Sequence, residues 1–168
     1  MIAITGATGQ LGHYVIKSLM KTVPASQIVA IVRNPAKAQA LTAQGITVRQ
    51  ADYGDEAALT SALQGVEKLL LISSSEVGQR APQHRNVINA AKTAGVKFIA
   101  YTSLLHADKS PLGLADAHIE TEKMLADSGI VYTLLRRKAV ACLTDWRICW
   151  RILTLAHRKA VCLMTAKR

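Results

Sequence analysis

The stretch Ile2-Ala3-Ile4-Thr5-Gly6-Ala7-Thr8-Gly9-Gln10-Leu11-Gly12 decides the fold of this 168-residue chain. Its first part, residues 2–5, is a short β-branched run of the kind that forms a buried parallel strand. The glycines at positions 6, 9 and 12 stand where the chain has to turn tightly before entering a helix. Apolar residues then recur at helical spacing from Leu11 to Leu19, and Pro24 marks the end of this helix. The sequence therefore begins with a predicted strand, glycine turn and helix.

The same alternation continues to residue 135. Five further apolar runs predict strands at 27–32, 46–51, 68–72, 98–102 and 130–135. The segments between these runs predict helices at 36–44, 55–63, 82–94 and 114–128, and a polar loop at 103–113. Parallel strands need crossover helices, so this order predicts an α/β fold with a Rossmann-type, doubly wound parallel sheet.

In such sheets, ligands bind outside the carboxyl ends of the strands, at the point where the strand order reverses. The loops expected at that edge contain small, polar and charged residues. They are Gly6–Gly12, Arg33, Asp52, Ser73–Ser75 and Thr102–His106.

The glycine turn is the strongest of these signals, because a strand precedes it and a helix follows it. Its glycines allow a tight turn, a close approach of a pyrophosphate and close packing of helix against strand. We therefore predict dinucleotide binding by Gly6, Ala7, Thr8, Gly9, Gln10, Leu11 and Gly12. The alternative is a tight turn that binds no ligand.

Arg33 follows the second predicted strand, at the position that distinguishes NAD from NADP. An acid there would accept hydrogen bonds from ribose hydroxyls, whereas a cation suits the 2′-phosphate of NADP. Arg33 therefore favours NADPH over NADH, unless it is an ordinary surface arginine. Asp52, after the third strand, is predicted to accept from the adenine amino group, or else to be an acid at a helix N-terminus.

Ser73, Ser74 and Ser75 form the exit loop of the fourth strand, where the ribose and nicotinamide of a cofactor would pass. Their small size suits such a passage, although serine-rich turns are also common connectors. We include all three among the predicted cofactor-binding residues.

The catalytic residue is less clear from the sequence. Reductases often use a Tyr and a Lys four residues apart, but the residue four positions before Lys123 is Ile119. His118 and Glu122 share a helix face, and His118 is the weak catalytic candidate. The alternative is a histidine whose hydrogen bonds are satisfied within the fold. No spacing of potential ligands, such as a CxxC pair, predicts a metal site.

The net charge of +10 is unevenly distributed. Residues 1–135 hold 12 Lys and Arg against 10 Asp and Glu, whereas residues 136–168 hold 9 against 1. Because the surplus lies in the tail, the sequence predicts no specific nucleic-acid partner. No apolar run is long enough to span a membrane, and the opening residues do not resemble a secretory signal, so a cytoplasmic protein is expected.

The composition changes near residue 136. Residues 136–168 contain all three cysteines and both tryptophans but no glycine or proline. Three readings compete for this segment: a basic helix, a fusion scar, or out-of-frame translation after a deletion. The enrichment in Arg, Cys and Trp favours the last. We accordingly predict an NAD(P)-binding domain over 1–135 and an atypical basic tail over 136–168, either out of frame or unstructured.

With the glycine turn, Arg33, Ser73–Ser75 and the Tyr101-Thr102-Ser103 strand end assembled, residues 1–135 resemble the NmrA-like atypical short-chain dehydrogenases. The resemblance implies reduction of a small-molecule quinone by direct hydride transfer from NADPH, with neither metal nor flavin. It also implies a carboxyl-terminal region that covers the nicotinamide and forms the quinone pocket; here that region is missing or replaced. The alternative function is a non-catalytic, NADP-binding redox sensor of the NmrA type.

Overall fold

The computed structural model describes residues 1–76, 78–105, 107, 115–137 and 160–163. Seven strands form one sheet in the order β3-β2-β1-β4-β5-β6-β7, and every neighbouring pair is parallel. The strands are β1 (Ile2–Thr5), β2 (Ile28–Val32), β3 (Thr47–Gln50), β4 (Lys68–Leu71), β5 (Phe98–Leu104), β6 (Val131–Arg137) and β7 (Ala160–Leu163). The order reverses between β1 and β4, which confirms the predicted Rossmann-type, doubly wound sheet.

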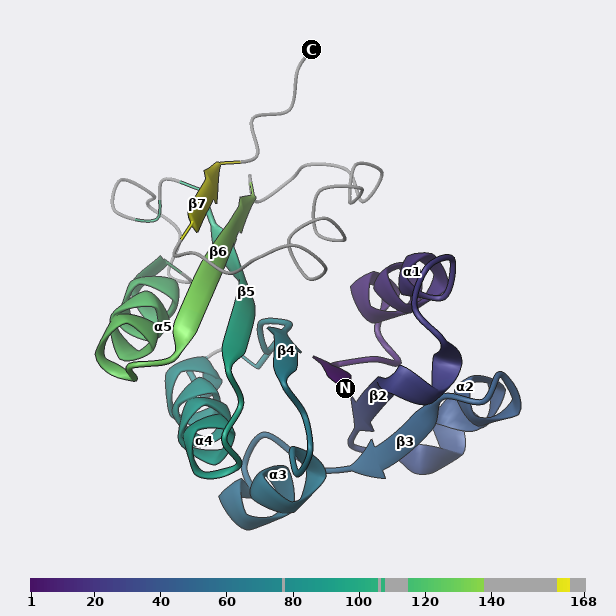
Figure 1. The fold of residues 1–168 in the computed structure, drawn as a ribbon. Coiled ribbons are helices and arrows are strands. Elements are labelled where there is room, and N and C mark those ends of the chain that lie inside the picture. The colour runs from purple at the N-terminus through teal and green to yellow at the C-terminus, as the bar shows by residue number, and fades with distance from the viewer. Residues whose placement is uncertain (77, 106, 108–114, 138–159, 164–168) are drawn as a thin grey trace.

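Helices cover both faces of the sheet (Figure 1). They are α1 (Gln10–Leu19), α2 (Gln39–Ala43), α3 (Glu56–Ala62), α4 (Arg80–Thr93) and α5 (Ala115–Asp127). Buried residues of α1 and α2 share one apolar core, and those of α3, α4 and α5 share the core on the opposite face. Among the described residues, no helix has the length and apolar character needed to cross a bilayer. Because β1 pairs in parallel with both β2 and β4, the carboxyl ends of these three strands lie at the same edge of the sheet.

Several predicted elements begin or end at other residues in the structure, and two of these differences have a local cause. The helix expected over 36–44 is divided into a 3-10 turn, Pro35–Ala38, and the short helix α2. The side chain of Asn34 accepts a hydrogen bond from the Ala36 N–H at 3.0 Å, which starts the turn before the α-helix. Strand β5 extends to Leu104 rather than ending at 102, because its last residues pair with the last two residues of β6.

The basic tail contributes more to the sheet than the sequence predicted. Strand β6 runs to Arg137, past the expected boundary at 135, and β7 pairs with it in parallel from Ala160 to Leu163. Residues 138–159 and 164–168, which include two of the cysteines and both tryptophans, lie outside the described residues. Part of the segment 136–168 is therefore integrated into the fold.

Candidate functional site

A pocket of about 430 Å³ lies at the carboxyl ends of β1, β2 and β4. It occupies the switch point of the sheet, where ligands of this fold class bind. Eleven of the twelve predicted cofactor-binding residues line it, all except Ala7. Within the part of the chain that the structure describes, the pocket is lined by Gly6, Thr8, Gly9, Gln10, Leu11, Gly12, Ile31, Val32, Arg33, Asn34, Lys37, Ala51, Asp52, Tyr53, Ile72, Ser73, Ser74, Ser75, Glu76 and Gln83.

The glycine turn forms one wall of the pocket. Gly6 has a φ of 61°, a left-handed conformation that a side chain would strain. Gly9 is the N-cap of α1 and provides no side-chain hydrogen bond to the first turn of that helix. The first N–H groups of a helix lack intrahelical partners. They can therefore donate to an anion, and the helix dipole favours negative charge at the same place.

Gly12 allows α1 to pack closely on the turn. A Cβ at this position would lie 2.7 Å from Ala7 Cα and closer still to the Gly6 carbonyl oxygen. Both are backbone atoms, so a side chain would force the turn itself to move. Ala7 is only 1% exposed and packs into the core shared with α1. The structure therefore places Ala7 behind the turn rather than on the pocket wall.

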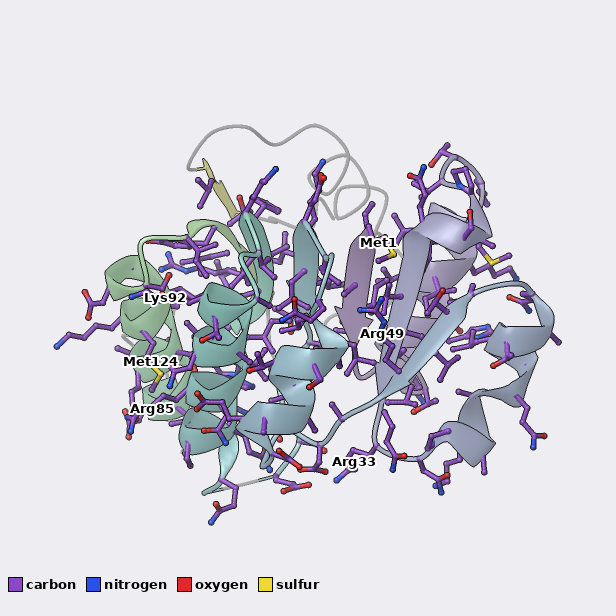
Figure 2. The ribbon with its side chains drawn as sticks, turned by 60° about the horizontal axis from the view of Figure 1, so that its bottom comes forward. Met1, Arg33, Arg49, Arg85, Lys92 and Met124 are labelled. Carbon is purple, nitrogen blue, oxygen red and sulfur yellow. The ribbon has the colours of Figure 1, made fainter. Side chains whose placement is uncertain are left out.

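Arg33 lines the pocket and immediately follows β2. Figure 2 labels its side chain. Its side chain is 66% exposed, and its Nη1 donates to Glu76 Oε1 at 2.7 Å. A second acid, Asp52, lies 3.9 Å from Arg33 Nε through its Oδ2. Arg33, the residue predicted to bind the 2′-phosphate, is therefore a cation that already has acidic neighbours from two loops.

Asp52 also shapes its own loop. Its Oδ1 accepts from the Gly54 N–H at 2.7 Å, a local turn that leaves Oδ2 facing Arg33. The alternative role predicted for Asp52, an acid at the start of a helix, is filled by Asp55. That residue is the N-cap of α3 and accepts from the Ala58 N–H at 2.9 Å.

Tyr53 connects this loop to the other side of the pocket. The Tyr53 hydroxyl donates to the Ile72 carbonyl at 2.7 Å. Asn86 Nδ2 of α4 donates to the backbone carbonyl of Tyr53 at 3.0 Å. Burial raises the pKa of Tyr53 well above its ordinary value. The phenol therefore stays neutral and acts as a fixed hydrogen-bond donor in the pocket lining.

The three serines after β4 are held from two directions. Ser73 N–H donates to Thr102 Oγ1 of β5 at 2.8 Å, and Ser74 N–H donates to His84 Nε2 of α4 at 2.9 Å. The Ser74 hydroxyl donates to Gln83 Oε1. Ser75 is exposed. The loop therefore lines the pocket in a fixed conformation, and the side chain of Ser74 is already engaged by the protein.

His84 is a residue that the sequence analysis missed. It is fully buried, and its Nε2 accepts from a backbone N–H, so the proton of the neutral ring lies on Nδ1. Nδ1 in turn lies 3.0 Å from Thr121 Oγ1 of α5. Burial, and then the nearby His118 and Arg80, lower the pKa of His84 to about 3. His84 therefore connects α5 to the serine loop as a neutral ring.

His118, the weak catalytic candidate, lies outside the described lining of the pocket. It is 7% exposed, and its Nδ1 shares a 2.6 Å hydrogen bond with the hydroxyl of the fully buried Tyr101. Burial first, and then Arg80, lower the pKa of His118 to about 4, whereas burial raises the pKa of Tyr101. This geometry matches the alternative prediction of a histidine satisfied within the fold.

Glu76 and Gln83 are further lining residues that the sequence analysis did not select. Glu76 directly follows the serine loop at the exit of β4. A charged residue next to a loop that is expected to face the ligand is the sequence signal that could have identified it. Gln83 lies on α4, and its Nε2 donates to Glu76 Oε2 at 2.6 Å. Together with Ser74, these residues form a hydrogen-bonded group opposite Arg33.

A parallel sheet with this strand order, and with a glycine-lined pocket at its switch point, defines a Rossmann-type nucleotide-binding domain. Residues 6–147 match the family model described as NAD(P)H-binding. The chain belongs to this NAD(P)H-binding family. The match extends beyond residue 135, where the sequence resemblance was expected to stop.

Individual relatives agree with the predicted NmrA-like resemblance. The chain is 96% identical over 136 residues to quinone oxidoreductase 2 of Escherichia coli K12, covering 81% of this chain and 48% of the relative. It is 37% identical over 140 residues to an NmrA-like family domain-containing oxidoreductase of Aspergillus flavus, covering 79% and 46%. The crystal structure of the Escherichia coli NADPH-dependent quinone oxidoreductase complexed with NADPH superposes with a TM-score of 0.79 at 96% identity, covering 82% and 48%. The chain spans about half the length of these relatives.

Proposed function

We propose that this chain binds NADPH in the switch-point pocket and serves as the cofactor-binding part of an NADPH-dependent quinone reductase. One observation carries the proposal: the pocket brings the uncapped start of α1 and the guanidinium of Arg33 into one lining. These are the groups that a dinucleotide pyrophosphate and a 2′-phosphate require. The relative that is 96% identical is a quinone oxidoreductase, which supports the choice of substrate class.

The residues of the pocket fit this cofactor part by part. The N–H groups at the start of α1 would hold the pyrophosphate, and the absence of a side chain at Gly9 would let it approach the backbone. Arg33 would pair with the 2′-phosphate, while Asp52 would accept from the adenine. The nicotinamide ribose would lie along the loop of Ser73, Ser74 and Ser75, whose side chains are small.

When bound, NADPH supplies a hydride, which a quinone takes up together with one proton to become a hydroquinone. The contribution of this chain is to bind and orient the nucleotide, because correct positioning supplies much of the rate enhancement in such reactions. His84 and Thr102 hold the backbone of the serine loop, so they act as positioning residues rather than catalytic ones.

The test is a titration of the purified 168-residue chain with NADPH, followed by nicotinamide fluorescence and then by addition of a simple benzoquinone. We expect saturable binding and quinone-dependent oxidation of NADPH. Binding without oxidation would reject the reductase activity of this chain and leave either a nucleotide-binding part that lacks its quinone pocket or the NADP-binding sensor. Absence of binding would reject both functions.

A further inference from the structure

The Arg33–Glu76 ion pair crosses the pocket that we propose for NADPH. Arg33 follows β2 and Glu76 follows the serine loop after β4, so their 2.7 Å contact joins the two sides of the switch point. Both residues line the pocket. The cation predicted to bind the 2′-phosphate is therefore engaged by a carboxylate of the same chain.

The carboxylate of Glu76 is held more firmly than the guanidinium of Arg33. Its Oε2 accepts from Gln83 Nε2 at 2.6 Å, and its backbone N–H donates to Ser74 Oγ at 3.2 Å. Gln83 is itself 9% exposed and bonded to Ser74, so one side of Glu76 is fixed to the buried start of α4. Arg33, in contrast, has a long side chain that is 66% exposed. If the pair separates, Arg33 is the residue that moves.

A 2′-phosphate and the Glu76 carboxylate would compete for the same guanidinium. A phosphate carries more charge than a carboxylate and forms paired hydrogen bonds with arginine, so it can displace Glu76. The displaced carboxylate stays near the phosphate because Gln83 holds it, and like charges at short range repel. Both effects oppose NADPH and leave NADH, which lacks this phosphate, unaffected.

We propose that Glu76 is a specificity-determining residue, which competes with the 2′-phosphate for Arg33 and so limits the preference of the pocket for NADPH over NADH. This inference rests on the proposed function, namely that the pocket binds NADPH.

The variant Glu76→Gln tests the inference, since it removes the charge but keeps the length of the side chain and an oxygen for Gln83. Affinities for NADPH and NADH are measured by nicotinamide fluorescence on the full chain. We expect NADPH to bind about threefold more tightly, the scale of a weak exposed ion pair, and NADH to bind as before. The matched control is Glu120→Gln, because Glu120 forms a 2.8 Å surface pair with Arg85 away from the pocket. This control should leave both affinities unchanged.

The same change in an Arg33→Ala background separates competition from direct repulsion. We expect Glu76→Gln to have a smaller effect there, because only the direct repulsion remains once the guanidinium for which Glu76 competes is gone. An undiminished gain in that background, or an unchanged or weaker affinity of the single variant for NADPH, would overturn the inference. If the unmodified chain binds NADPH but Glu76→Gln leaves the ratio of the affinities for NADPH and NADH unchanged, only this inference fails. If the unmodified chain binds neither nucleotide, the proposed function fails and the inference fails with it.

Discussion

Ser74 donates its backbone N–H to Nε2 of the fully buried His84 across 2.9 Å, so a ring on α4 fixes the loop that follows β4. On the other side of the ring, Nδ1 lies 3.0 Å from Thr121 Oγ1, and that hydroxyl donates to the Ala117 carbonyl at 2.7 Å. This chain of hydrogen bonds requires neutral His84 with its proton on Nδ1. The conformation of the pocket loop therefore depends on the protonation state of a histidine in the core.

The free energy of unfolding should fall as the pH decreases below about 6.5, the ordinary pKa of histidine. The pKa values of His84 and His118 in the folded chain are about 3 and about 4. Between these values and 6.5 the unfolded chain binds protons that the folded chain does not, so acid favours unfolding. Between pH 7 and pH 5, each histidine should lower the free energy of unfolding by about 2 kcal/mol. Urea denaturation at several pH values measures this loss.

The variant His84→Gln should reduce that pH dependence, because a carboxamide can accept from Ser74 and donate to Thr121 without titrating. The matched control is His13→Gln, which makes the same substitution at an exposed histidine on α1. Identical slopes for His84→Gln and the unmodified chain would contradict a neutral His84 in the folded state.

Gly12→Ala should cost more stability than an alanine at another glycine of the fold. The added Cβ would lie 2.7 Å from Ala7 Cα, so we expect a loss of about 3 kcal/mol from overpacking. The comparison is Gly95→Ala, where φ is 76° and no atom lies within 4 Å of the added Cβ. That change should cost only about 1–2 kcal/mol, the strain of a left-handed residue. Denaturation midpoints of the two variants decide the order, and equal losses would show that the turn adjusts to a side chain.

Glu122→Gln should destabilise the end of the sheet. Glu122 of α5 is 15% exposed, pairs with Arg136 of β6, whose side chain is 31% exposed, and accepts from the Ser103 hydroxyl of β5. Removing the carboxylate charge weakens these contacts and leaves Arg136 less compensated, so we expect a loss of about 1–3 kcal/mol. The control Glu120→Gln removes an exposed pair that solvent screens, and its effect should be much smaller. Comparable losses of stability in both variants would show that Glu122 does not anchor β6.

The glycine turn and the alternation of strands and helices follow from local spacing, which is why the sequence predicted them. Gly6, Gly9 and Gly12 lie within one turn and one helix start, and the apolar runs are short and separate. Arg33 was recognisable because it directly follows a strand. These features depend on neighbours a few residues away, so a pattern can indicate them.

The partners of Arg33 could not be predicted in the same way. Glu76 lies 43 residues further along the chain and meets Arg33 only because β1 and β4 are adjacent in the sheet. The role of His84 was hidden for a different reason: the buried face of α4 includes Arg80, Gln83 and His84, so apolar periodicity does not mark it. Strand β7 was missed because a basic, cysteine-containing tail gave no strand signal apart from one short run.

The most direct test of the account is a parallel titration of the chain with NADPH and NADH, followed by nicotinamide fluorescence, for the unmodified protein and for Arg33→Ala. Arg85→Ala, which removes an exposed arginine of α4 outside the pocket lining, is the matched control. The account predicts that the unmodified chain and the control bind NADPH more tightly than NADH. It also predicts that Arg33→Ala weakens NADPH by about 10- to 100-fold, the scale of a charged hydrogen bond, with little change for NADH. Equal weakening of both nucleotides, or no binding of NADPH by the unmodified chain, would contradict it.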